Sequence, residues 1–172
     1  RILKIMNRHY DKEHYLELVR KIKEAVPDMA ITTDIIVGFP TETTEDFEDT
    51  IKILEKVKYD SIFSFIYSPR EGTPAAKMKP QILQRVKKHR RDQIMRIQQE
   101  IAFERAEHMI GRELLVMIEG KVADENAYVG RTYKDAPNVD GLIFVESDEE
   151  LMSGDFAKVR VTGALEYDLI GE

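Results

Sequence analysis

The first half of the chain alternates between helical and strand patterns of apolar side chains. Five of them recur at helical spacing before Pro27, which ends this predicted helix: Tyr15, Leu18, Val19, Ile22 and Val26. Residues 29–37 then form an apolar, β-branched run of strand length without polar alternation. Such a run predicts a strand buried on both faces, as the strands of parallel α/β sheets are.

A second helix and a second strand follow. Thr43 or Thr44 is expected to cap the helix, with Asp46 in its first turn. The apolar face of this helix carries Phe47, Ile51, Leu54 and Val57. Residues 61–67 (SIFSFIY) predict the second buried strand, and a turn-rich segment comes after it. The order helix, strand, helix, strand predicts part of a βα wheel.

The second half of the chain changes pattern twice. Residues 82–110 contain no Gly or Pro and predict one long helix, a connecting arm that Gly111 ends. Beyond it, turn signals separate five short β segments, at residues 113–119, 127–132, 142–145, 156–163 and 167–170. Five short strands in about 60 residues predict a small barrel.

Composition narrows the class of protein. The chain has 172 residues, 42% of them hydrophobic, and no window approaches the roughly 18 consecutive apolar residues that a membrane span needs. It also lacks a basic-then-apolar signal pattern, so we expect a soluble, cytoplasmic protein without a membrane partner. With no cysteine and four scattered histidines, no metal site is predicted within the chain. Because it begins with Arg-Ile-Leu, without Met, we expect a piece of a longer polypeptide.

Charge is distributed unevenly along the chain. Residues 1–76 carry 11 basic and 14 acidic groups, residues 77–111 carry 9 and 4, and residues 112–172 carry 6 and 14. The formal net charge of −6 therefore divides into −3, +5 and −8. Regions that differ this much are expected to have different neighbours.

The stretch IIVGFPTETTEDF, residues 35–47, breaks the first predicted strand at Gly38-Phe39-Pro40. Ligands of parallel sheets bind outside the carboxyl ends of the strands, and Gly38 would let the backbone come close to one. A phosphate site is excluded, because Glu42, Glu45 and Asp46 would repel an anion. An apolar wall for a flat neutral or cationic ligand, such as an adenine ring or a sulfonium, is one interpretation. The residues alone favour the other, an ordinary strand-to-helix turn.

Further polar candidates each have a structural alternative. Asp34 is a weak candidate for a catalytic acid, because an Asp near a strand start more often satisfies nearby backbone. Lys4, Arg8 and His9 would suit a carboxylate, and otherwise form a loop with solvated charges. Tyr67-Ser68-Pro69 ends the second strand where a barrel places its site, or serves only the fold.

The basic cluster RVKKHRR, residues 85–91, suits RNA phosphates in one interpretation. A solvated helix face is the commoner arrangement, because no aromatic side chains interleave with these charges. The sequence contains no nucleophile with a base, no carboxylate pair and no metal motif. No catalytic residue is therefore predicted in this chain.

Three phrases resemble one enzyme family. LKIMNR at 3–8, TTDIIVGFPTETTEDF at 32–47 and FIYSPREGTPAAKM at 65–78 are similar to the methylthiotransferase branch of the radical S-adenosylmethionine (SAM) enzymes. The resemblance implies that residues 1–80 are the C-terminal portion of the radical SAM domain, an α/β partial TIM-like barrel. Residues 81–111 would be the connecting helix. Residues 112–172 would be the TRAM domain, a small five-stranded OB-like all-β barrel.

The resemblance also implies cofactors. Family members bind two 4Fe-4S clusters through cysteines, and the first cluster cleaves SAM to a radical that abstracts hydrogen from carbon. This chain has no cysteine, so by itself it is expected to be inactive. It would contribute one wall of the SAM pocket, formed by the two strand ends, with these residues: Val37, Gly38, Phe39, Pro40, Ile66, Tyr67 and Ser68. The family usually has Gly where this chain has Thr41. Because a threonine disfavours a positive φ, the sequence argues against any role of position 41 that requires one.

Two branches of the family differ in substrate. The tRNA branch should dock RNA through basic groups, whereas the predicted barrel of this chain carries −8. An acidic surface suits a basic ribosomal protein instead. The phrase GRTYKDAPNVDG at 130–141 also resembles the ribosomal-protein branch, the RimO type, whose target is an aspartate β-carbon in protein twelve of the small subunit. Asp135, Asp140 and Tyr133 are its candidate substrate-binding residues, although this phrase also suits an ordinary loop.

Two alternatives remain open. One is the tRNA adenosine methylthiotransferase (MiaB type), which the basic helix at 85–91 would favour by touching transfer RNA; in the RimO type the same helix would touch ribosomal RNA. The other is a non-catalytic OB-like binding module on a helical stalk.

Overall fold

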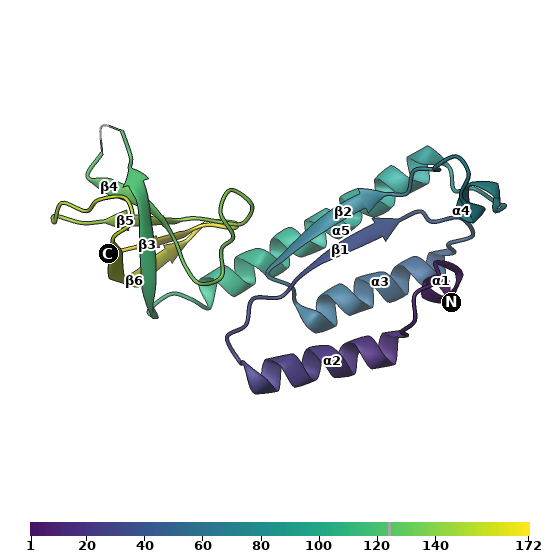
Figure 1. Cartoon of the computed structure of the whole chain (residues 1–172), viewed down its shortest axis with the longest axis horizontal. Coiled ribbons are helices and arrows are strands. Elements are labelled where there is room, and N and C mark those ends of the chain that lie inside the picture. The colour runs from purple at the N-terminus through teal and green to yellow at the C-terminus, as the bar shows by residue number, and fades with distance from the viewer. Residues whose placement is uncertain (124) are drawn as a thin grey trace. The chain divides into compact units, whose positions relative to one another are not determined.

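The computed structural model of the chain describes residues 1–123 and 125–172. They form two compact units, residues 1–98 and residues 99–172. Helix α5 (Gln84–Glu107) begins in the first unit and ends in the second (Figure 1). Within the described residues, no helix is both long enough and apolar enough to cross a membrane.

The first unit is built around two parallel strands. β1 (Thr32–Val37) and β2 (Ser61–Ile66) lie side by side and run in the same direction, and α3 (Thr44–Val57) connects them (Figure 1). Helix α2 (Lys12–Ala25) precedes β1. This is the predicted order of helix, strand, helix and strand, and the parallel pairing confirms the predicted α/β class. Two short helices were not predicted, α1 (Ile2–Ile5) and α4 (Pro74–Lys77).

Helix α3 begins and packs as its sequence predicts. The Thr43 side chain accepts a hydrogen bond from the Asp46 N–H, and the Asp46 side chain accepts one from the Thr43 N–H, which is a complete capping box. Phe47, Leu54 and Val57 are buried on one face. The helix ends at Lys58, whose left-handed φ of 53° stops it before β2.

The expectation that the strands are buried on both faces is wrong for this chain. Alternate residues of each strand point to opposite faces, and only the face that carries Val37 and Ile62 packs closely. Ile36, Phe63 and Phe65 are exposed on the other face. An apolar run without polar alternation therefore identified the strands, but not which face this chain covers.

The second unit is a closed barrel of five strands among the described residues, in the order β3-β4-β5-β7-β6. The strands span Glu113–Lys121 (β3), Ala127–Arg131 (β4), Ile143–Glu146 (β5), Phe156–Ala164 (β6) and Leu169–Gly171 (β7). β5 and β7 pair in parallel, and the other neighbours pair in antiparallel fashion. The predicted five-stranded OB-like barrel is confirmed.

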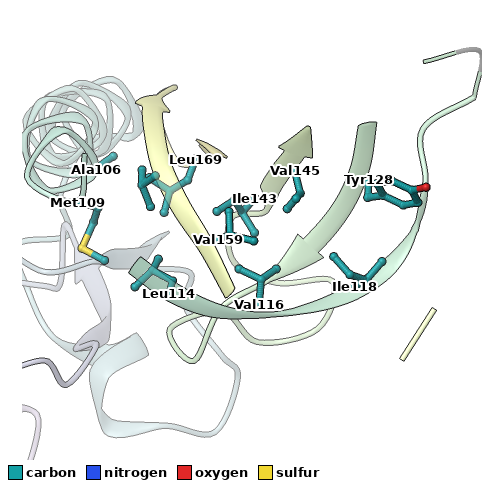
Figure 2. Packing of buried hydrophobic residues seen from close by; sticks show 11 residues of the cluster. Ala106, Met109, Leu114, Val116, Ile118, Tyr128, Ile143, Val145, Val159 and Leu169 are labelled. Atoms are coloured by element: carbon teal, nitrogen blue, oxygen red, sulfur yellow. The ribbon is translucent and has the colours of Figure 1, made fainter. Parts of the chain in front are cut away.

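The barrel core is formed by the alternate, inward-pointing residues of the strands (Figure 2). Leu114, Val116 and Ile118 of β3 are all buried. Ala106 from the end of α5 and Met109 from the turn after it also join this core. Gly111 follows with a φ of +85°, and its N–H donates to the Val161 carbonyl oxygen at 2.8 Å. Helix α5 therefore ends at Glu107, three residues before the predicted end at residue 110, and Gly111 marks where the chain enters the barrel.

Candidate functional site

The two strand ends that were predicted to form a ligand wall lie together at one edge of the sheet. Val37 is paired with Ile66, and the Tyr67 N–H donates to the Val37 carbonyl oxygen at 2.9 Å. The turn Gly38-Phe39-Pro40 is buried directly after β1. Ser68 is exposed and Ile66 is half-buried at the end of β2. The seven predicted wall residues thus form one cluster, and their contact with a cofactor stays a prediction.

Gly38 is fixed by a buried ion pair. Its φ is +72°, and its N–H donates to both carboxylate oxygens of Glu42, at 3.0 and 3.1 Å. Arg90 of α5 donates to the same carboxylate from Nη1 at 2.5 Å, and its guanidinium lies 5.3 Å from the centre of the Phe47 ring. Sequence reasoning gave Glu42 only the role of repelling anions. Its carboxylate is instead buried and neutralised by Arg90.

The close approach that Gly38 permits is used by Lys87 of α5. A Cβ atom on Gly38 would lie 2.4 Å from Lys87 Cγ, so only glycine fits beside this side chain. Lys87 Nζ donates to the Tyr67 carbonyl oxygen at 2.8 Å and lies 5.0 Å from the centre of the Tyr67 ring. Burial lowers the pKa of Lys87, while the nearby Glu42 carboxylate opposes that shift. The space on the Cβ side of Gly38 is therefore filled by the stem of Lys87, and the approach of a ligand to the Gly38 backbone stays a prediction.

Tyr67 joins the two strand ends through its ring. The ring meets Phe39 edge-on, with the ring centres 5.1 Å apart. The Tyr67 hydroxyl is buried and has no hydrogen-bond partner among the described residues. A buried hydroxyl without a partner is uncommon and is the kind of group that a polar ligand satisfies.

Sequence reasoning missed two residues at the same end of the sheet. Ile36 and Phe65 are paired neighbours, and the two residues are 40% and 51% exposed. They lie one position before Val37 and Ile66, so they point to the opposite face. Strand alternation around the predicted residues was the signal that would have found them.

The weaker candidates lie elsewhere on the first unit. Asp34 is exposed on the same face as Ile36, where it is paired with Phe63. Lys4 is in α1, Arg8 and His9 follow it, and all three are exposed. These positions agree with solvated charges.

The basic cluster at 85–91 is divided between two environments. Lys87 and Arg90 are only 4% and 7% exposed, so a uniformly solvated helix face is wrong for these two. Arg85, Lys88 and His89 are exposed. Any nucleic-acid contact of this cluster would depend on the exposed members.

The loop predicted to bind substrate is organised by its own aspartates. Asp135 accepts hydrogen bonds from the Thr132 N–H at 2.8 Å and from the Thr132 hydroxyl at 2.7 Å. Burial raises the pKa of Asp135, although these hydrogen bonds oppose the shift. Asp140 Oδ2 accepts from the Ala136 N–H at 3.0 Å. Both carboxylates therefore hold the loop in shape, whereas Tyr133 is exposed.

The described residues contain no group of three or more His, Cys, Asp or Glu side chains that could hold a metal ion. The chain has no cysteine at all. Thiolate ligands for an iron–sulfur cluster are therefore not among its residues.

Comparison with known proteins assigns both units to families. Residues 1–54 match the radical SAM superfamily, and residues 110–172 match the TRAM domain. The ribosomal protein uS12 methylthiotransferase RimO of Lachnoclostridium phytofermentans is 52% identical over 170 residues, which cover 99% of this chain and 39% of that protein. The RimO of Thermoanaerobacter sp. is 41% identical, over 99% of this chain and 38% of that protein.

Relatives with another substrate in their name are also similar. The tRNA-2-methylthio-N(6)-dimethylallyladenosine synthase of Caldicellulosiruptor saccharolyticus is 44% identical over the whole of this chain and 35% of that protein. The chain thus spans well under half the length of the curated relatives that it matches. It belongs to the radical SAM methylthiotransferase family, of which it contains part of the radical SAM domain and the TRAM domain.

Proposed function

We propose that the chain is part of a methylthiotransferase that modifies an aspartate of ribosomal protein uS12. The observation that carries this proposal is the 52% identity, over 99% of the chain, to a protein named for that reaction. The similar proteins that are named for tRNA modification reach 44 or 45%, and other proteins named RimO reach 38 to 42%, so the proposal rests on the 52% match. The proposed target atom is the aspartate β-carbon.

Charge supports the choice of a protein substrate. Residues 112–172 carry 6 basic and 14 acidic groups. A surface of this sign attracts a basic ribosomal protein and repels the phosphates of RNA. In this proposal the barrel binds uS12, and the exposed Tyr133 in the loop at 130–141 contributes to that contact. Asp135 and Asp140 support it indirectly, by fixing the loop.

The strand ends of the first unit are suited to one side of a SAM pocket. Ile36 and Phe65 offer an exposed apolar surface for an adenine ring, and the buried Tyr67 hydroxyl lacks a partner among the described residues. When bound, SAM supplies the radical chemistry of the family. In this proposal the strand ends line the cofactor pocket. The chain supplies no thiolate ligand to a cluster, because it has no cysteine. The chain alone is therefore expected to be inactive.

A tRNA substrate is the second candidate. It is supported by the similarity to tRNA-2-methylthio-N(6)-dimethylallyladenosine synthases and by the net charge of +5 over residues 77–111. Burial of Lys87 and Arg90 weakens this alternative, because it removes two cations from the surface that would face RNA. A non-catalytic OB-like binding module would instead leave both substrates unchanged.

The two substrates are distinguished by one experiment on the full-length protein. The protein is reconstituted with iron and sulfide and supplied with SAM, a reductant and a sulfide source. It is then incubated in parallel with uS12 and with tRNA that carries N(6)-dimethylallyladenosine. Mass spectrometry of uS12 peptides is expected to find one aspartate with a methylthio group in place of hydrogen. Methylthiolated adenosine with unmodified uS12 would reverse the assignment, and no modification of either would favour the binding module.

A further inference from the structure

Two buried cations, one helical turn apart on α5, contact the ends of both parallel strands. Lys87 and Arg90 are 4% and 7% exposed, although both belong to a strongly basic stretch of sequence. Their neighbour Lys88 is exposed. Two members of the basic cluster are thus directed into the protein at the place where a ligand is expected.

Arg90 fixes the end of β1 through Glu42. Its Nη1 donates to Glu42 Oε1 at 2.5 Å and lies 3.4 Å from the Glu42 carbonyl oxygen. The same carboxylate accepts the Gly38 N–H through both oxygens. Loss of the guanidinium would leave a buried carboxylate without its counter-charge, and this carboxylate holds Gly38 in its left-handed conformation.

Lys87 contacts both strand ends directly. Its aliphatic stem fills the space beside Gly38, and its ammonium donates to the Tyr67 carbonyl oxygen at 2.8 Å. The ammonium also lies 5.0 Å from the centre of the Tyr67 ring, which in turn packs on Phe39. One lysine therefore sets the separation of the two turns and the position of the Tyr67 ring.

Stability alone does not account for these charges. Burying a cation costs desolvation free energy, and apolar side chains of similar volume often stabilise a fold as well or better. The two cations fix the orientation of two backbone groups, which apolar side chains would not do. Arg90 acts through Glu42 on the Gly38 N–H, and Lys87 acts on the Tyr67 carbonyl group. Fixing a binding surface before the ligand arrives lowers the entropy cost of binding.

We propose that Lys87 and Arg90 are positioning residues for SAM, acting on the cofactor through the Gly38–Glu42 contact and through Tyr67. The inference rests on the proposed function, because it requires that SAM binds at these strand ends. Neither cation needs to touch the cofactor. Their removal should weaken SAM binding even where the protein remains folded.

Equilibrium dialysis with radiolabelled SAM on the reconstituted full-length enzyme tests this proposal. Lys87→Met and Arg90→Met each keep a long apolar stem and remove the charge. The Kd for SAM is expected to rise about tenfold in each variant, as for the loss of a preorganised contact. The matched control Lys88→Met, which removes a neighbouring exposed cation, should stay within about twofold of the unmodified enzyme. In turnover assays the KM for SAM should rise with the Kd, while kcat at saturating SAM stays within about twofold.

Milder variants cover the case in which a methionine variant does not fold. Glu42→Gln keeps an acceptor for the Gly38 N–H and removes the ion pair, and Lys87→Arg and Arg90→Lys keep the charge with altered geometry. Each is expected to give a Kd between those of the unmodified enzyme and the methionine variants. SAM binding equal to that of the unmodified enzyme in every folded variant would overturn the positioning role and leave the proposed function intact. An unmodified enzyme that does not bind SAM would overturn the proposed function itself.

Discussion

Thr41 has a backbone conformation that its side chain disfavours. Its φ is +70°, in the left-handed region where a β-branched residue is a true outlier. The turn is held from several directions: the Thr41 N–H donates to the Pro80 carbonyl oxygen at 3.1 Å, and Arg1 Nη2 donates to the Thr41 carbonyl oxygen at 2.6 Å. The position thus needs a positive φ, which is the property that the family's usual glycine supplies without strain.

Replacing Thr41 with Gly should therefore stabilise the first unit. Relief of the left-handed strain exceeds the added chain entropy of glycine, and we expect the free energy of unfolding to rise by about 1 kcal/mol. Urea unfolding followed by circular dichroism measures this. The control Thr41→Ala keeps a Cβ atom and should gain less. A Thr41→Gly variant that unfolds more easily than the original chain would contradict the strain argument.

Asp46 links the start of α3 to Arg1. The hydrogen bond from Arg1, with further hydrogen bonds from Thr43, lowers the pKa of Asp46 from 3.8 to about 2. A carboxyl group with a lowered pKa contributes stability above its unfolded pKa and loses that contribution as the pH falls toward its folded pKa. Because Arg1 is half exposed, solvent screens the pair and the contribution should be on the order of 1 kcal/mol.

This pH dependence is tested with Asp46→Asn. The stability difference between the original chain and the variant should be constant above about pH 5 and should shrink as the pH falls from about 4 to about 2. Urea unfolding at a series of pH values measures that difference. If it did not change over this interval, the charge of Asp46 would make no contribution through Arg1.

Residue-level roles at the strand ends were the least predictable from sequence. The position of Gly38-Phe39-Pro40 followed from the strand pattern, and so did the capping box of α3. That Lys87 would fill the space beside Gly38 did not, because the two residues are far apart in sequence and a lysine in a basic run suggests solvent. The role of Asp135 was not predictable either. Its partner Thr132 is near in sequence, but the burial of its carboxylate depends on the fold of the barrel.

At the scale of elements, α5 shows why the basic cluster at 85–91 was expected to be solvated although two of its residues are buried. Its buried side chains in the first unit are Lys87, Arg90, Ile94 and Gln98, spaced three or four residues apart. Two of these four side chains are charged and Gln98 is polar. The pattern of hydrophobic residues therefore could not predict which face of α5 packs against the first unit. Gln98 is fully buried and donates to the Tyr59 carbonyl oxygen at 2.9 Å. The barrel strands, by contrast, followed the two-residue alternation closely and were predicted almost to their ends.

The packing of α5 gives a matched pair of substitutions. Ile94 is 0% exposed and its neighbour Met95 is 39% exposed. Ile94→Ala should lower the free energy of unfolding of the first unit by about 3 kcal/mol, because it removes buried methyl groups and leaves a cavity. Met95→Ala should change it by less than about 1 kcal/mol. Thermal unfolding of the two variants beside the original chain makes the comparison. Equal losses would mean that α5 does not pack through the stripe of Ile94.

At the scale of the whole molecule, the uneven distribution of charge was visible in the sequence, and the fold decides which of these charges are exposed. The chain's acidic excess is concentrated in the barrel region, residues 112–172, whereas the most basic stretch, residues 77–111, contributes buried cations to the first unit. The basic stretch is therefore less available to a polyanion than its sequence suggests. The acidic residues at 148–150 are all exposed, after the last residue of β5.

If the barrel attracts a basic ribosomal protein, removing these charges should slow association. We expect the triple variant Asp148→Asn, Glu149→Gln and Glu150→Gln in the full-length enzyme to bind uS12 with an association rate constant reduced about tenfold at low salt. The difference should narrow as salt is raised, because exposed charges are screened beyond about 8 Å at physiological ionic strength.

The control is a second triple variant with the same change of charge. It removes three exposed acidic groups from the first unit by Glu13→Gln, Glu48→Gln and Glu55→Gln. Surface plasmon resonance over a series of salt concentrations separates the two sets. Equal effects would reduce the argument to net charge, and faster binding to tRNA than to uS12 by the unmodified enzyme would favour the tRNA substrate.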